Sequence, residues 1–164
     1  MLQARDIMTK EVLSVPPETL VSDLAKTLVG KNISGVPVVD ADGRLVGIVT
    51  QSDLVMRAQE LELPPALNIL DLHLYLDIPS HLFHKLEKML GATVGDIMSP
   101  KPVTVSPDTP MPRLAALMAK QKVYTLPVLE AGKIVGIIGK IDLVRALARE
   151  WTDTGAPEGA GEAP

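Results

Sequence analysis

Apolar residues follow two patterns along the chain, and each pattern predicts a different kind of element. Short runs rich in Val, Ile and Leu between turn residues predict strands, at residues 12–15, 36–40, 45–50, 103–105, 126–130 and 133–138. Apolar residues three or four positions apart predict helices; two such stripes are Leu20, Leu24 and Leu28, and Leu114, Leu117 and Met118. Two shorter helices are expected at residues 53–59 and 142–149.

The same order of elements occurs twice, so the chain contains a tandem duplication. Matching positions lie 90 residues apart before one turn and 89 residues apart after it. The matches are 6–8 with 96–98, 36–38 with 126–128, Gly47 with Gly136, and Asp53 with Asp142. The offset changes between residues 40–44 and 130–133, which are glycine-containing turns of the hairpin type. A hairpin loop can change length by one residue without disturbing its strands.

Each copy therefore predicts a β-α-β-β-α unit, and the fold class is α/β of the α+β kind. One unit spans roughly 55 residues, which is small for an independent core, so we expect the two to pack with pseudo-twofold symmetry. The expected organisation is a first repeat at 1–59, an insertion at 60–93, a second repeat at 94–151 and a disordered tail at 152–164. The insertion is apolar enough to be packed, with a helix around residues 82–90, and its role is open.

Composition and charge narrow the classes of function. The net charge is −4 without a long basic run, which argues against nucleic acid as a partner. The chain has no cysteine, so disulfides, thiolate metal sites and a cysteine nucleophile are excluded. No apolar stretch approaches the roughly 20 residues of a membrane-spanning helix, and no secretory signal follows Met1. We therefore expect a cytoplasmic protein that does not contact a membrane.

The repeated motifs resemble those of a tandem pair of cystathionine-β-synthase (CBS) domains, an arrangement called a Bateman module. The resemblance rests on the Asp-Ile-Met opening, the x-Pro-Val strand start, the Gly-Ile-Val strand and the Thr-x-x-Asp at its end, and it covers residues 4–149 except the insertion. It implies regulation without catalysis and without a required cofactor. Members bind AMP, ADP, ATP or S-adenosylmethionine between the repeats. A homodimer is also expected, with the signal passing to an effector protein or through oligomerisation.

The resemblance also implies a set of binding residues. In the family, the motif aspartate holds the ribose hydroxyls and the Thr or Ser lies beside the sugar-phosphate, which makes Thr50 and Asp53 the first site. A carboxylate suits this role because its charge-assisted hydrogen bonds are stronger than neutral ones. Adenine is expected against the backbone of residues 33–37 and the segment near Lys10 and Val12. The other binding residues implied are Ile33, Ser34, Val36, Pro37, Val103, Tyr124, Thr125, Pro127 and Asp142.

The second site departs from the family motif. Gly139 stands where Thr or Ser is usual, so Asp142 lacks one neighbouring hydroxyl. The positions before the strand proline, which often carry His or Arg in phosphate-binding members, are Ser34 in the first copy and Tyr124 and Thr125 in the second. Candidate substitutes for a basic residue are Lys10, Lys31, Lys101, Lys122 and Lys140. We therefore predict one intact and one weakened site.

Plainer interpretations of the same residues stay open. Thr and Asp are common helix caps, and capping is compatible with ribose binding at Thr50, Asp53 and Asp142. The histidines, His73, His81 and His84, do not predict a metal site, because zinc needs three or four ligands and no third ligand is suggested by spacing. No catalytic constellation can be assembled, so an enzyme is not predicted. The main alternative is a structural or protein-interaction module whose sites stay empty.

Overall fold

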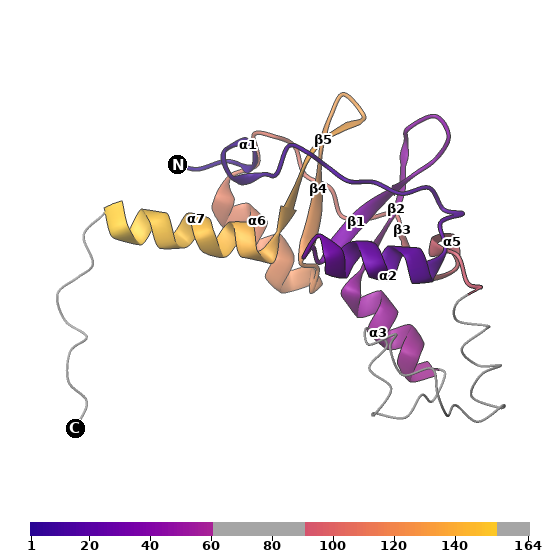
Figure 1. Cartoon of the computed structure of the whole chain (residues 1–164). Helices are drawn as coiled ribbons and strands as arrows, with labels where there is room; N and C mark the ends of the chain where they lie inside the picture. The colour runs from indigo at the N-terminus through magenta and orange to yellow at the C-terminus, as the bar shows by residue number, and fades with distance from the viewer. Residues whose placement is uncertain (61–90, 154–164) are drawn as a thin grey trace, which may run out of the picture.

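The structure, a computed structural model, describes residues 1–60 and 91–153 (Figure 1). Within these ranges the helices are α1 (Ala4–Ile7), α2 (Val21–Gly30), α3 (Gln51–Glu60), α5 (Val94–Ile97), α6 (Met111–Gln121) and α7 (Lys140–Asp153). The strands are β1 (Gly35–Val39), β2 (Leu45–Thr50), β3 (Ser99–Pro100), β4 (Thr125–Glu130) and β5 (Lys133–Gly139). The mixed α and β class and the repeated order of helix, hairpin and helix are confirmed.

Each repeat is built around an antiparallel hairpin, β1 with β2 and β4 with β5. The first hairpin has residues 40–44 between the paired Val39 and Leu45, and the second has residues 130–133 between Leu129 and Ile134. The second turn is thus one residue shorter, which explains the change of offset. The predicted extended segments add one parallel bridge each, Val15 to Val38 and Val105 to Val128.

The long helices cover the hairpins with aliphatic faces. Leu24 and Leu28 of α2 are buried in one core cluster, and Leu114 and Met118 of α6 are buried in another. Burying such a side chain stabilises the fold by about 1.5–3 kcal/mol. Leu20, which the pattern placed on the same buried stripe, is 42% exposed because α2 begins only at Val21.

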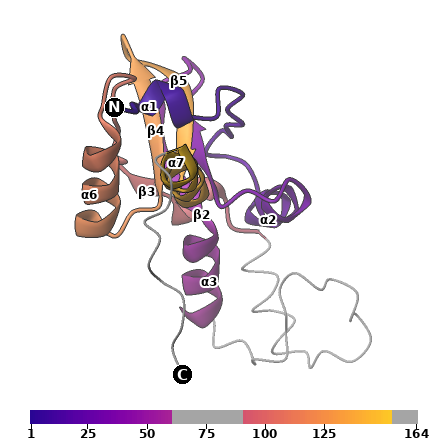
Figure 2. The ribbon, with the colours of Figure 1, turned by 90° about the vertical axis from the view of Figure 1, so that its left-hand side faces the viewer.

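The opening segment of each copy packs against the other copy. The helix α1, from the first copy, contacts β5 and α7, and its Ala4 is buried in the core cluster of the second repeat. The helix α5, from the second copy, contacts α3, and its Val94 is buried in the core cluster of the first repeat. Figure 1 shows α1 and α5 at opposite sides of the molecule, and Figure 2 shows α1 beside β4 and β5.

Matching hydrogen bonds hold the two exchanged openings. The Ala4 N–H donates to the Thr109 carbonyl (2.9 Å), and the Val94 N–H donates to the Thr19 carbonyl (2.7 Å). The chain after α5 forms β3, which pairs with β2, and the chain after α1 bridges β5 at Thr9. Each contact occurs twice with the roles of the copies reversed, so the predicted pseudo-twofold symmetry is confirmed.

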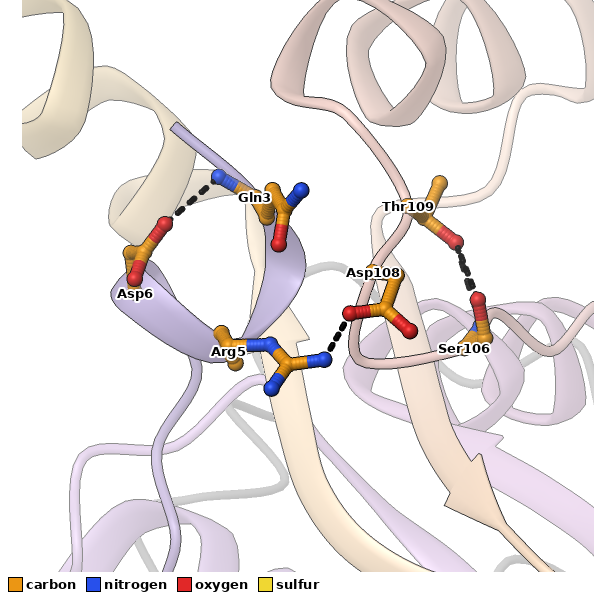
Figure 3. Close-up of polar contacts among 6 residues, drawn as sticks. All are labelled: Gln3, Arg5, Asp6, Ser106, Asp108 and Thr109. Atoms are coloured by element: carbon orange, nitrogen blue, oxygen red, sulfur yellow. Dashed lines mark hydrogen bonds and ion pairs between the residues drawn. The ribbon is translucent and has the colours of Figure 1, made fainter. Parts of the chain in front are cut away.

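Side chains distinguish the two openings (Figure 3). The Asp6 carboxylate accepts a hydrogen bond from the Gln3 N–H (2.8 Å), as the Asp96 carboxylate does from the Thr93 N–H (2.8 Å). Among the described residues, only the first opening has an ion pair, between Arg5 and Asp108 in the turn before α6. The counterpart of Arg5 is Gly95, where a Cβ would lie 3.3 Å from Pro17. Both members of the ion pair are largely exposed, so we expect it to add little stability.

One predicted boundary differs from the structure, and three predictions fall outside the described residues. The helix α7 includes Thr152 and Asp153, so ordered structure extends two residues into the predicted tail. The helix expected at 82–90, the three histidines and the rest of the tail lie outside the described residues. Ala92, near the end of the predicted insertion, is 8% exposed, and its carbonyl accepts a hydrogen bond from the Val21 N–H. No helix within residues 1–60 and 91–153 has the length and apolar character needed to span a membrane.

Candidate functional site

In each repeat, the last hairpin strand leads directly into a helix. The first junction comprises residues 50–53, where β2 ends at Thr50 and α3 begins; the second comprises residues 139–142, where β5 ends at Gly139 and α7 begins. The first helical N–H of each junction donates to the residue before the opposite strand: Gln51 to the Ser34 carbonyl (2.9 Å) and Lys140 to the Tyr124 carbonyl (3.0 Å). The junctions are therefore fixed by backbone hydrogen bonds.

At the first junction, Asp53 caps the start of α3. Its Oδ2 accepts hydrogen bonds from the Thr50 N–H (2.7 Å) and the Thr50 hydroxyl (3.1 Å), and the group is partly buried. This is the geometry of a helix cap, so the capping role considered for these two residues is present. The other oxygen, Oδ1, makes no hydrogen bond with the described residues.

Gln51 is a first-junction residue that the sequence reasoning missed. Its side-chain Nε2 donates to the Ile33 carbonyl (3.1 Å), which is part of the backbone expected to face adenine. That carbonyl is thus already engaged by the protein. In the sequence, Gln51 could have been found as a junction residue only from its position directly after the motif threonine, Thr50.

At the second junction, Asp142 has a different set of neighbours. Its Oδ2 accepts the Gly139 N–H (2.7 Å), without the hydroxyl that Thr50 supplies in the first repeat. Its Oδ1 lies 3.8 Å from Nη1 of Arg145, and the Asp142 side chain is only 16% exposed. Arg145 is a second residue that the sequence reasoning missed, and the signal was its position three residues after Asp142 on a helix.

The cations are distributed unequally between the junctions. The first-repeat counterpart of Arg145 is Met56, which is 62% exposed, and the counterpart of Lys140 is Gln51. Lys140 Nζ lies 5.2 Å from the centroid of the Tyr124 ring, within the range of a cation–π interaction. The second junction therefore carries two cations where the first carries uncharged side chains.

The starts of the two hairpins approach each other across the pseudo-twofold axis. A Cβ placed on Gly35 would lie 2.9 Å from Cγ2 of Thr50 and 3.3 Å from Oγ1 of Thr125, which belongs to the other repeat. A Cβ placed on Gly139 would lie 3.9 Å from Oγ of Ser34, again across the axis. Glycine at residue 35 thus permits the close contact with Thr50 and Thr125, and the Ser34 hydroxyl of the first repeat lies near Gly139 of the second junction.

The remaining predicted site residues lie in varied environments. Several are buried in or beside the core, so only their backbone could face a ligand: Val36, Pro37, Thr125 and Pro127. Val12 and Val103 are partly buried, whereas Lys10, Ser34 and Tyr124 are exposed. Of the candidate lysines, the structure places only Lys140 at a junction; no contact with Asp53 or Asp142 is found for Lys10, Lys31, Lys101 or Lys122 among the described residues.

A metal ion has no evident site in the described part of the chain. Within it, no three His, Cys, Asp or Glu side chains are grouped so that they could hold one. The chemistry of the junctions is instead that of hydrogen bonding to hydroxyl groups and of one arginine and one lysine near an aspartate. This chemistry suits a neutral sugar or an anionic small molecule.

Comparison with known proteins identifies relatives along almost the whole chain. The chloroplastic CBS domain-containing protein CBSX2 of Arabidopsis thaliana is 35% identical over 139 residues, which are 80% of this chain and 57% of CBSX2. An uncharacterised protein of Methanocaldococcus jannaschii is 32% identical over 151 residues, which are 87% of this chain and 89% of that protein. The chain thus spans little more than half of the first relative and most of the second.

Solved structures with the same architecture include two that are similar in sequence. The crystal structure of CBSX2 in complex with AMP has a TM-score of 0.68 and 30% identity, and the match covers 92% of this chain and 98% of that one. The CBS domain of a membrane protein from Sphaerobacter thermophilus has a TM-score of 0.66 and 28% identity over 88% of this chain and 87% of that chain. The family model for the CBS domain matches residues 4–60 and 94–149. The chain therefore belongs to the CBS domain family, and its two repeats form a tandem CBS pair.

Proposed function

We propose that this CBS pair is a regulatory module that binds an adenine nucleotide or a related adenosyl compound between its repeats and does not catalyse a reaction. The observation that carries the proposal is the geometry of Asp53. One carboxylate oxygen is fixed by the N–H and hydroxyl of Thr50, and the other makes no hydrogen bond with the described residues. The similarity to CBSX2, which was solved in complex with AMP, supports the ligand class.

The geometry of Asp53 suits recognition of a ribose. A carboxylate accepts hydrogen bonds only, so its unengaged oxygen would bind a ligand hydroxyl and not a phosphate. The carboxylate is held in place before the ligand arrives, because Thr50 already contacts it in the structure. Such preorganisation lowers the entropic cost of binding. We therefore assign the ribose hydroxyls to Asp53 and the neighbouring sugar-phosphate to Thr50.

The second junction provides a weaker or differently selective site. Asp142 lacks a hydroxyl at residue 139 and lies beside Arg145, so its charge is partly balanced before any ligand binds. Arg145 is 68% exposed and would be free to turn toward a ligand phosphate. Regulation would follow if a ligand binds one arrangement of the repeats more tightly than another. We propose that the output passes to an effector protein or through oligomerisation in the cytoplasm.

A homodimer is part of this proposal. Ile141, Val144 and Trp151 lie on one face of α7 and are 55%, 49% and 66% exposed. Exposed apolar side chains at helical spacing are costly in water and favour a contact with a second copy. Light scattering at micromolar concentration is expected to give the mass of two chains, and a monomer would contradict this part of the proposal.

The test is isothermal titration calorimetry with AMP, ADP, ATP and S-adenosylmethionine on the Asp53→Asn variant. Loss of a hydrogen bond to a charged group costs about 1.5–3 kcal/mol, so the affinity of the first site should fall roughly 10- to 150-fold. Asp96→Asn is the matched control, because Asp96 also accepts hydrogen bonds from the N–H (2.8 Å) and hydroxyl (2.9 Å) of a threonine, Thr93, but lies on α5 and not at a junction.

Two results would contradict the assignment of the site. An Asp53→Asn variant that binds every compound as tightly as the unmodified protein would show that Asp53 is only a helix cap. Equal losses in Asp53→Asn and Asp96→Asn would show that capping and not ribose binding is affected. If no compound binds the folded, unmodified protein, the structural or protein-interaction module becomes the better interpretation.

A further inference from the structure

Each exchanged opening ends in a methionine that lies on a glycine of the opposite hairpin. Met8 directly follows α1, and a Cβ placed on Gly136 would overlap its Sδ and lie 2.8 Å from its Cγ. Met98 directly follows α5, and a Cβ placed on Gly47 would lie 2.5 Å from its Sδ and 3.1 Å from its Cγ. In both copies the thioether sulfur therefore occupies the space of an absent side chain and lies on the strand backbone of the other repeat.

Each methionine joins the two parts of the contact between its opening and the other repeat. Met8 packs against the core cluster of the second repeat, and the next residue, Thr9, exchanges backbone hydrogen bonds of 2.9 and 3.0 Å with Ile137. Met98 packs against the core cluster of the first repeat, and the next residue, Ser99, begins β3, which pairs with β2. Displacement of either side chain would therefore disturb both the apolar packing and the strand pairing of its opening.

Exposure distinguishes these two methionines from those on the helices α3 and α6. Met56 of α3 is 62% exposed, whereas Met111 and Met118 of α6 are only 6% and 4% exposed. Met8 and Met98 are partly buried. A small oxidant in solution would reach Met56 without disturbing the core, and it would not reach the methionines of α6 in the folded protein. Met8 and Met98 combine the two properties, because they are accessible in part and are also packed.

The sulfur chemistry of this chain belongs to methionine alone, because the chain has no cysteine. Hydrogen peroxide oxidises a thioether by two electrons: a sulfur lone pair attacks one peroxide oxygen, the S–O bond forms as the O–O bond breaks, and the other oxygen leaves as water with the transferred oxygen's proton. The sulfoxide is polar and chiral, and methionine sulfoxide reductases reverse its formation. No space remains for its oxygen between the sulfur and the glycine backbone, so the side chain has to move.

We propose that Met8 and Met98 are oxidation sites for a hydroperoxide, and that their sulfoxides release the exchanged openings and loosen the packing of the two repeats. A flexible apolar side chain that fills a gap becomes a polar one that the same gap does not accommodate. The pseudo-twofold symmetry makes the two sites equivalent, so oxidation affects both links between the repeats. This inference goes beyond the proposed function and does not depend on ligand binding.

The test combines peptide mass spectrometry with calorimetry after hydrogen peroxide treatment of the folded protein. Met8, Met98 and Met56 should each gain one oxygen, whereas Met111 and Met118 should gain it only if the protein is unfolded before treatment. The Tm should fall by roughly 2–8 °C for each sulfoxide at an opening, because a polar group replaces a packed apolar one. Complete oxidation of Met8 and Met98 with an unchanged Tm would overturn the inference, and so would their remaining unoxidised when Met56 is fully oxidised.

Substitution separates the methionines of the openings from the others. The double variant Met8→Leu, Met98→Leu keeps apolar side chains of similar volume and has no thioether at either opening. Peroxide treatment should leave its Tm unchanged. The matched control Met56→Leu removes an exposed methionine instead, and its Tm should fall as far as that of the unmodified protein. Equal losses in the double variant and the control would overturn the inference.

Enzymatic repair gives a test that needs no variant and so does not depend on folding of the double variant. The oxidised, unmodified protein is treated with both types of methionine sulfoxide reductase, because each type reduces one sulfoxide epimer. Loss of the added oxygens from Met8 and Met98 should restore the original Tm. Loss of these oxygens without recovery of the Tm would overturn the inference, since the destabilisation would then have another cause. The proposed function stands or falls separately, by the titrations described above.

Discussion

Gly47→Ala probes the exchange of the opening segments. Gly47 lies in β2, where the opening of the second copy crosses it. An alanine Cβ would lie 2.5 Å from Sδ of Met98 and 3.0 Å from the carbonyl oxygen of Ser99. The methionine can rotate away, but the Ser99 backbone is held in β3 by its pairing with β2. Relief of the overlap therefore requires a shift of the strand.

The expected cost follows from this geometry. Overpacking of a filled site destabilises by about 1–3 kcal/mol, and each kcal/mol lowers the Tm of a chain of this size by roughly 2–4 °C. Differential scanning calorimetry should therefore show a Tm lower by about 2–12 °C. Gly30→Ala is the matched control, because a Cβ there meets nothing within 4 Å and the change is expected to stabilise by about 0.4–1 kcal/mol.

A double-mutant cycle with Met98→Ala makes the test specific. If Met98 is the neighbour of Gly47, the two substitutions should couple by about 0.5–3 kcal/mol, as contacting residues do. Strict additivity would refute the exchanged packing. So would a Gly47→Ala variant as stable as Gly30→Ala.

Two further predictions concern pH and assembly. The N–H and hydroxyl of Thr93 lower the pKa of Asp96, so its contribution to stability is present above the unfolded pKa of about 3.9 and is lost as pH falls through the lower folded value. The Tm difference between the unmodified protein and Asp96→Asn should be constant from about pH 7 to 5 and shrink below about pH 4; a difference independent of pH would contradict this. Val144→Asp should weaken the proposed dimer at least tenfold in sedimentation equilibrium. The control Val29→Asp changes a residue that is 53% exposed on α2 and should leave the dimer affinity unchanged. Equal effects of the two substitutions would argue against α7 as the contact between the two copies.

The duplication made most of the fold predictable. Two copies of one pattern give independent evidence for each element, and the strands of both hairpins were predicted to within one residue of β1, β2, β4 and β5. The stripe of α2 failed only at Leu20, because hydrophobic spacing does not show where a helix begins. The caps at Asp53 and Asp142 also follow local rules, since a cap depends on residues three apart.

The exchange of openings could not be predicted from the repeat. Because the two copies are alike, Ala4 and Val94 suit the core of either repeat. The pattern of apolar residues is therefore the same whether each opening packs on its own repeat or on the other one. A signal existed in Gly47 and Gly136, since glycine inside a strand often marks a close approach of another segment. Those residues face Met98 and Met8 of the exchanged openings. The position of Ser34 beside Gly139 depends on how the two repeats pack. The spacing of residues along the sequence gives no information about that packing.

We propose above that this CBS pair binds an adenosyl ligand at the junction of Thr50 and Asp53. Calorimetric titration of the unmodified protein with AMP tests it most directly. We expect saturable binding with a micromolar Kd, which corresponds to about −8 kcal/mol, and an affinity of the first site that is roughly 10- to 150-fold weaker in Asp53→Asn. Folded protein that gives no heat with AMP, ADP, ATP or S-adenosylmethionine would contradict it.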